Sequence, residues 1–151
     1  MPMTANDLRP YYVVAQTIFD FFVSHGFTPE QACGVVANAD AESSMRVNVV
    51  GDKGHAFGLF QLHADRADLI KAGCGIDIRT ASAADQCSAV LWELNKSERR
   101  AMTALRQAKT AYDAAHDFCR YYERPGSTLQ YAIRGDKGEQ WLLWFKKHSG
   151  A

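Results

Sequence analysis

The chain of 151 residues is long enough for one compact domain with a hydrophobic core and too short for two domains of ordinary size. Apolar residues make up 47% of it and charged residues 23%, which is typical of a folded globular protein and excludes a disordered or fibrous chain. Seventeen basic side chains balance 17 acidic ones, so no net charge favours binding to nucleic acid or to an anionic membrane. We therefore expect a single domain over residues 1–151 that acts as a monomer.

The N-terminal part of the sequence gives no sign of an export signal. Met1–Pro10 contains no basic segment followed by an apolar run, and the apolar stretch Tyr11–Val23 is interrupted by Gln16, Thr17 and Asp20. We therefore expect neither a signal peptide nor a membrane span.

Two helices are predicted at the start of the chain. Apolar side chains recur at three- and four-residue steps over Pro10–His25, and Gly26 follows as a helix stop. Thr28-Pro29-Glu30-Gln31 has the pattern of a capping box with proline in the first turn. This pattern predicts a second helix from about Pro29 to about Ser44.

A glycine-rich segment, Asn48–Gln61, interrupts the helical pattern. Its glycines favour a turn or small hairpin over a helix. Helical periodicity then returns in five segments, namely His63–Ala72, the stretch after Ser82 through Leu94, Ser97–Ala108, the stretch after Thr110 through Tyr122, and Thr128–Lys147 with a break near Gly135–Gly138. The expected fold is mainly α, with six to seven helices and one small β element.

The four cysteines do not suggest a metal site, because they lie far apart and no C-x-x-C or zinc-like histidine spacing occurs. Cys33 and Cys119 stand among apolar residues and are expected to be buried free thiols. Cys74 and Cys87 flank a twelve-residue segment and could pair in an oxidising environment. The sequence leaves their state open.

Glu42 is the first candidate for chemistry. Val35 and Ala39 share its helix face, so this face points toward the core or a cleft wall. Burial and the negative end of the helix dipole both disfavour ionisation of such a carboxyl. A carboxyl that stays protonated near neutral pH can donate a proton to a leaving glycosidic oxygen. A solvated residue at a frayed helix end fits the same pattern.

The glycine-rich segment supplies possible partners for this acid. Eighteen residues separate Glu42 from Gln61, and between them Asp52 lies on a glycine-flanked turn. Glycines let a polymeric substrate approach the backbone, and Phe57 and Phe60 could offer an apolar surface to a sugar face. The expected arrangement is a helix-borne acid that faces a small turn across a groove.

Several segments occur in the same order in a known family, and the chain resembles the phage tail-type lysozymes. The resemblance rests on Ala41-Glu42-Ser43, Gly51-Asp52-Lys53-Gly54, Ala56-Phe57-Gly58-Leu59-Phe60-Gln61, Asp65-Arg66, Leu91-Trp92-Glu93-Leu94, Ser97-Glu98-Arg99-Arg100-Ala101 and Tyr121-Tyr122-Glu123-Arg124-Pro125-Gly126. It covers roughly Thr28 to Gly126. Glu-Ser followed at this distance by Gly-Leu-Phe-Gln is also similar to goose-type lysozymes and lytic transglycosylases.

The resemblance implies a lysozyme-like α+β fold with a small β element beside a substrate cleft. It implies cleavage of the β-1,4 bond between N-acetylmuramic acid and N-acetylglucosamine, without a cofactor or a metal. Glu42 matches the acid of the family, and Asp52 matches a position where related enzymes place a second carboxylate that holds water or stabilises the transition state. Asp52 could equally be a turn residue, because aspartate tolerates turn geometry.

Further substrate-binding residues follow from the same resemblance. Gln61 is expected to bind substrate or orient Glu42, with a buried amide that fixes the turn as the alternative. Tyr121 and Tyr122 fall where the superfamily has an aromatic cleft residue, and one of the two is expected to pack in the core. The remaining expected contacts are Ser43, Phe57, Gly58 and His63.

Two residues near the expected cleft have weaker assignments. His55, like His63, is interpreted as a surface or cleft-lining residue, because their spacing matches no metal-ligand pattern. Glu123 is a possible second acid, but Arg124 beside it favours an exposed ion pair.

The sequence is compatible with three functions. Muramidase activity is the leading expectation, because Asp52 suggests a hydrolase that activates water. A lytic transglycosylase would use the same acid but form an anhydro ring, and a non-catalytic wall-binding tail component would keep only the fold. The expected partners are peptidoglycan glycan strands and a phage tail or tail-like particle. The protein would be tail-associated or reach the cell wall without a signal peptide.

Overall fold

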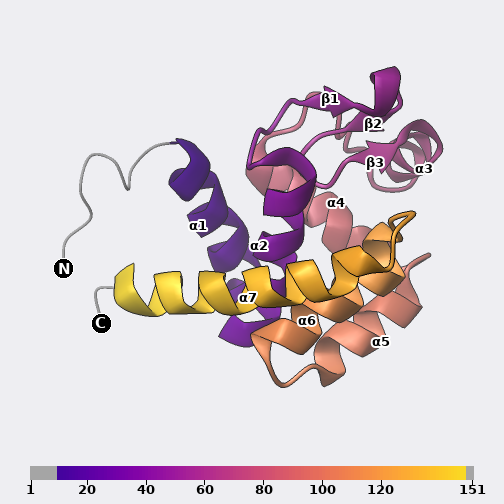
Figure 1. The fold of residues 1–151 in the computed structure, drawn as a ribbon. Helices are drawn as coiled ribbons and strands as arrows, with labels where there is room; N and C mark the ends of the chain where they lie inside the picture. The colour runs from indigo at the N-terminus through magenta and orange to yellow at the C-terminus, as the bar shows by residue number, and fades with distance from the viewer. Residues whose placement is uncertain (1–9, 149–151) are drawn as a thin grey trace.

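The computed structural model describes residues 10–148, so the prediction about an export signal at residues 1–9 lies outside the described part. Between residues 10 and 148 the fold has seven α-helices and one small antiparallel sheet (Figure 1). The expectation of a mainly helical protein with a small β element is confirmed. No helix in this range is long and apolar enough to cross a membrane.

The helices and strands follow the predicted order. The N-terminal half contains α1 (Pro10–Ser24), α2 (Pro29–Ser43), β1 (Val50–Gly51), the 3-10 turn η1 (Asp52–Gly54), β2 (Ala56–Phe57), β3 (Leu62–His63) and α3 (Ala64–Cys74). The C-terminal half contains α4 (Ala83–Asn95), α5 (Arg99–Gln107), α6 (Ala111–Phe118), the π-helical turn η2 (Cys119–Glu123) and α7 (Leu129–His148).

Helix α2 is the centre of the fold. The predicted capping box is present: the Thr28 hydroxyl accepts from the Gln31 amide at 3.1 Å, and the Gln31 side chain accepts from the Thr28 amide at 3.0 Å. The helix packs against α1, α6 and α7, and α7 crosses in front of it (Figure 1). Its residues from Gln31 to Asp40 are all buried, which holds the C-terminal end of α2 in a fixed position.

Helix α7 runs without interruption through Gly135 and Gly138, so the predicted break there is wrong. The glycines serve helix packing instead. A Cβ at Gly138 would lie 2.5 Å from the carbonyl oxygen of Ala111, and one at Gly135 would lie 2.6 Å from the ring of Tyr112. Both contacts belong to α6, so the two glycines let α6 and α7 approach closely.

This packing gives Gly138→Ala a predictable sign. Alanine is the better helix former by about 1 kcal/mol, so helix propensity alone would stabilise the variant. We expect instead a loss of about 1–3 kcal/mol, because the new methyl group meets a backbone carbonyl that cannot rotate away. Urea unfolding measures the difference, with Gly126→Ala as the control, since nothing lies within 4 Å of a Cβ there. A stabilised Gly138→Ala would contradict the close approach.

The glycine-rich segment forms the three-stranded sheet, in the order β1-β2-β3. Val50 pairs with Phe57, and Ala56 pairs with His63. The sheet and α3 form a small lobe at the C-terminal end of α2 (Figure 1). Gly58 has φ +78° and leaves room for Gln86, whose side-chain oxygen a Cβ would approach to 2.5 Å.

All four cysteines are free. Cys33 and Cys119 are buried, as predicted, and burial raises the pKa of their thiols to about 12 and about 11. Cys87 is buried as well, while Cys74 is partly exposed. The alternative of a Cys74–Cys87 disulfide is therefore not realised in this structure.

Candidate active site

A polar cavity of about 520 Å³ lies where the C-terminal end of α2 meets the sheet, α3, η2 and α7. Its lining is Glu42, Gln61, His63, Asp65, Arg66, Glu123, Arg124, Pro125, Gly126 and Arg134. Most of these side chains are ionisable or polar, which suits a hydroxyl-rich ligand better than an apolar one.

Glu42 lies in this cavity but is not the unpaired carboxyl on an apolar face that the sequence suggested. Its Oε2 accepts a hydrogen bond of 2.7 Å from Arg134 on α7, and 20% of its side chain is exposed. Arg134 itself is buried and also donates to Asn38 at 3.0 Å and to Gln130 at 3.3 Å. Several contacts fix this guanidinium, so Glu42 has a rigid cationic neighbour.

Glu123 enters the same cavity, and the prediction that it forms an exposed pair with Arg124 is wrong. Arg124 pairs instead with Glu98, which follows α4. The turn that ends at Glu123 is π-helical, with the Arg124 amide bonded to the Cys119 carbonyl at 2.8 Å. The Oε2 of Glu123 is buried and has no hydrogen-bond partner among residues 10–148.

The environment of Glu123 favours its neutral form. Burial raises the pKa of the Glu123 carboxyl well above its usual value, and the negative charge of Glu42 raises it further. The guanidinium groups of Arg134 and Arg66 oppose this shift without cancelling it. The cavity thus contains two carboxyl groups, and ionising both of them is unfavourable.

The raised pKa of Glu123 predicts how Glu123→Gln changes stability with pH. The folded protein holds this proton more tightly than the unfolded chain does, so the contribution to stability is fully present at low pH. It is lost as the pH rises through the pKa of the folded form. Glutamine cannot ionise, so the variant should gain thermal stability relative to the parent at about pH 8 and not at about pH 4. Each kcal/mol corresponds to about 2–4 °C in Tm. Equal Tm differences at both pH values would contradict a neutral Glu123.

Asp52 lies at the edge of the cavity rather than in it. It is in η1 with φ +50°, and 59% of its side chain is exposed. Its Oδ2 is 3.3 Å from Nε2 of His63, which lines the cavity. The turn conformation agrees with the turn-residue interpretation, while the contact with His63 brings the carboxylate close to the mouth of the cavity.

Gln61 lines the cavity, but its amide group is used within the sheet lobe. The Nε2 donates to the carbonyl oxygens of Val49 at 3.2 Å and Gly58 at 2.9 Å. A Cβ at Gly51 would lie 2.2 Å from the Gln61 Oε1. These contacts match the alternative in which Gln61 fixes the turn.

Three further candidates do not line the cavity. Ser43 is buried, and its hydroxyl donates to the Ala39 carbonyl at 2.8 Å, so its expected contact with substrate finds no support. The guanidinium carbon of Arg79 lies over the ring of Phe57, 4.7 Å from the ring centre. The backbone of Gly58 is buried against Gln86. His55 is exposed on the turn and is not part of the lining.

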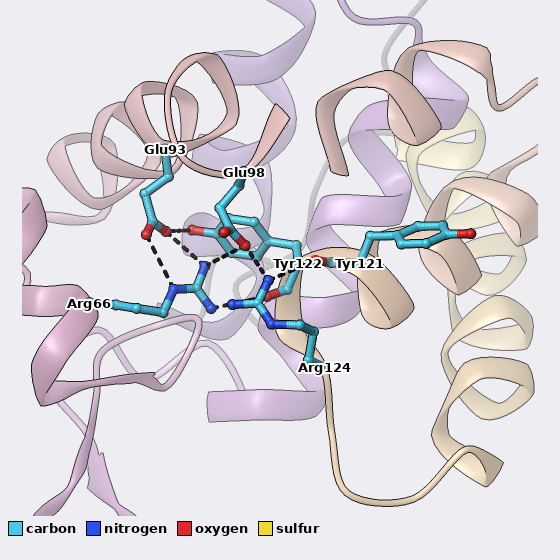
Figure 2. Close-up of polar contacts among 6 residues, drawn as sticks. All are labelled: Arg66, Glu93, Glu98, Tyr121, Tyr122 and Arg124. Carbon is cyan, nitrogen blue, oxygen red and sulfur yellow. Dashed lines mark hydrogen bonds and ion pairs between the residues drawn. The ribbon is translucent and has the colours of Figure 1, made fainter. Parts of the chain in front are cut away.

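The two tyrosines point in different directions, and neither lines the cavity around Glu42 (Figure 2). Tyr122 is the core residue of the pair: it is fully buried, and its hydroxyl donates to Glu93 at 2.6 Å. Burial, followed by the charge of Glu93, raises the pKa of Tyr122 well above its usual value, so the phenol remains a donor. Tyr121 lines a neighbouring cavity.

A charge network includes Arg66 and Arg124, which line the cavity (Figure 2). Arg66 donates to both oxygens of Glu93, at 2.8 and 3.2 Å, and to the Tyr122 carbonyl at 3.0 Å. Arg66 also lies 3.6 Å from Glu98, which binds Arg124. These residues come from α3, α4, η2 and the segments that follow α4 and η2, so the network holds distant parts of the chain around the site.

Sequence reasoning missed Arg134 altogether. The arginine is 92 residues from Glu42 in the chain, and no motif links them. One local signal exists: Arg134 occupies the helix face that also carries the buried residues Gly138 and Trp141. An arginine on a buried face requires a partner, which would have indicated an acid elsewhere in the fold.

Within residues 10–148, no group of three or more histidine, cysteine, aspartate or glutamate side chains is placed to hold a metal ion.

Comparison with known proteins identifies the family of the chain. The family model described as phage tail lysozyme matches residues 13–145. A curated relative, Morphogenesis protein 1 of Bacillus phage B103, is 27% identical over 155 residues, which covers 95% of this chain. The chain spans only 41% of the length of that relative. Because the family match extends over most of the chain, the protein belongs to the phage tail lysozyme family.

Proposed function

We propose that the protein is a muramidase that cleaves the β-1,4 bond between N-acetylmuramic acid and N-acetylglucosamine. The observation that carries the proposal is the presence of two carboxyl groups, Glu42 and Glu123, in one polar cavity at the end of α2. Glu42 is the proton donor for the leaving sugar oxygen, as its match to the acid of the family implies.

We infer that Glu42 and Glu123 act as a coupled pair, in which burial and the charge of Glu42 raise the pKa of Glu123. Ionising Glu123 beside an ionised Glu42 would leave two negative charges in a partly buried space, so the pair retains one proton near neutral pH. Both carboxyls line the cavity and are partly exposed, and Glu42, with 20% of its side chain exposed, is the one that matches the acid of the family.

The remaining steps use the same groups. Proton transfer from Glu42 breaks the glycosidic bond and leaves positive charge on the anomeric carbon. Water then attacks that carbon and returns a proton to the Glu42 carboxylate. Arg134 keeps this carboxylate in place through its 2.7 Å hydrogen bond. The Asp52–His63 pair stands where it can orient the water at the mouth of the cavity.

The lytic transglycosylase alternative is favoured by one observation, namely that Asp52 is exposed and does not line the cavity. A transglycosylase needs no carboxylate for water, because a hydroxyl of the muramic acid itself attacks the anomeric carbon. Both enzymes would share Glu42 and Glu123. The two mechanisms therefore differ only in the group that attacks the anomeric carbon, which is water in the muramidase and a muramic acid hydroxyl in the transglycosylase.

Product analysis separates the two enzymes. Purified peptidoglycan is digested with the protein, and the fragments are examined by mass spectrometry. We expect reducing muramic acid ends, which carry one added water. Anhydro-muramic ends would instead identify a transglycosylase, and no fragments at all would support a non-catalytic wall-binding component.

Asp52→Asn tests the assigned role of the Asp52–His63 pair. If Asp52 orients water, the variant should lose about tenfold in turnover, less than the loss expected for Glu42, because other polar groups can partly replace it. Dye release from labelled peptidoglycan measures the rate, with exposed Asp68→Asn as the control. Unchanged turnover in Asp52→Asn would leave Asp52 as a turn residue.

The family and the phage relative also bear on where the domain acts. The family and the phage relative suggest that the domain acts from a virion or its tail, with glycan strands as its substrate. We propose that it reaches the cell wall as part of such a particle.

A further inference from the structure

A second cavity of about 370 Å³ adjoins the one around Glu42. It is lined by Ser97, Glu98, Arg100, Ala101, Arg120, Tyr121, Arg124 and Tyr131. Arg124 belongs to the lining of both cavities. A ligand that occupies the first cavity can therefore extend past Arg124 into the second.

The second cavity carries an excess of positive charge. The guanidinium carbons of Arg100 and Arg120 lie 4.7 and 5.0 Å from the ring centre of Tyr121. Neither arginine forms an ion pair with any residue between 10 and 148. The one acid in the lining, Glu98, is already paired with Arg124 and lies near Arg66. Arg100 and Arg120 thus have an aromatic neighbour but no counter-charge.

This arrangement suits an oxyanion. A guanidinium that packs over an aromatic ring keeps its N–H groups free at its edge, where they can donate to two oxygens at once. Carboxylate is the group that matches this donor geometry best, together with phosphate. Two arginines beside the same ring also repel each other, and an anion bound between them relieves that repulsion.

We propose that this second cavity binds a carboxylate of the peptide that muramic acid carries, while the glycan strand occupies the cavity around Glu42. This inference rests on the proposed function. The sugars of the strand are uncharged apart from their substituents, so a cationic cavity beside the cleft selects for the substituent. The protein should accordingly bind peptide-bearing strands more tightly than bare strands.

The test is a calorimetric titration with two probes. One probe is a short glycan strand with its peptides. The other is the same strand after an amidase has removed the peptides and the muramic acid carboxylates that this frees have been converted to amides. Both are titrated into the full chain carrying Glu42→Gln, which prevents turnover. We expect binding of the peptide-bearing strand to be about tenfold tighter, since a pair of charge-assisted contacts has that order of effect.

Variants then assign the preference to the cavity. In the Glu42→Gln chain, the added pair Arg100→Gln and Arg120→Gln should remove the preference and leave affinity for the bare strand unchanged. Arg99→Gln is the matched control, because Arg99 lies on the same helix α5 and outside the lining. Amidation of the peptide carboxylates should reproduce the loss without any change to the protein.

The outcomes separate this inference from the proposed function. Equal affinity of the Glu42→Gln chain for both probes would overturn the peptide site alone, whereas binding of neither probe would count against the proposed function itself. A preference that survives both substitutions would also overturn the assignment. A last comparison measures binding to walls before and after removal of their phosphate polymers. Loss of binding only on phosphate removal would identify the bound oxyanion as a phosphate and overturn the peptide proposal.

Discussion

Glu42→Gln should fold as the parent does and lose about 10²–10⁴-fold in turnover, because an amide cannot supply the proton that the leaving oxygen requires. The fold should survive because Arg134 keeps its hydrogen bonds to Asn38 and Gln130, and the amide oxygen can still accept from it. Dye release from labelled peptidoglycan measures turnover, and thermal unfolding confirms the fold.

The control for this experiment is Glu30→Gln, at the opposite end of α2. It makes the same chemical change on the same helix, outside the cavity around Glu42. Turnover of this control should stay close to that of the parent. Near-parental lysis by Glu42→Gln would show that another group donates the proton.

Arg66→Met should destabilise the fold by about 3–5 kcal/mol, because it leaves the buried carboxylate of Glu93 without its cationic partner. Only 3% of the Glu93 side chain is exposed, so water cannot replace the lost contacts. Urea unfolding measures the loss. Lys71→Met is the control. The Lys71 side chain is 61% exposed, and its ammonium lies 3.7 Å from Asp77 in a surface pair worth less than about 1 kcal/mol.

A second substitution checks the cause of this loss. Glu93→Gln in the Arg66→Met background removes the unpaired charge and still lets the amide accept from the Tyr122 hydroxyl. Part of the lost stability should return, since the two positions act on one interaction. A loss below about 1 kcal/mol in Arg66→Met would contradict the role of the network in holding the cavity wall.

The helices could be predicted largely because their signals are local. The Thr28 capping box and the proline after it define the start of α2, and the structure contains both reciprocal hydrogen bonds. The exception is α7, where Gly135 and Gly138 suggested a break. Their function is to admit α6, a contact between two helices that no local pattern reveals.

The candidate site could be predicted only in part. Glu42 was found because it lies on a recognisable motif at the end of a helix. Its neighbour Arg134 lies on a distant helix, so it emerged only from the tertiary structure. For Glu123, the adjacent Arg124 suggested a surface pair. Arg124 pairs with Glu98 rather than with Glu123, and Glu123, at the end of the π-helical turn, lines the cavity with one carboxyl oxygen buried.

The pH dependence of turnover in the parent and in Glu123→Gln tests most directly whether Glu42 and Glu123 share one proton. Turnover needs a proton on the pair, so the parent should lose activity above an apparent pKa that belongs to both carboxyls. Glutamine removes the second negative charge, and the basic limb should then move to lower pH. A basic limb at the same pH in both proteins would contradict a shared cavity and a shared proton.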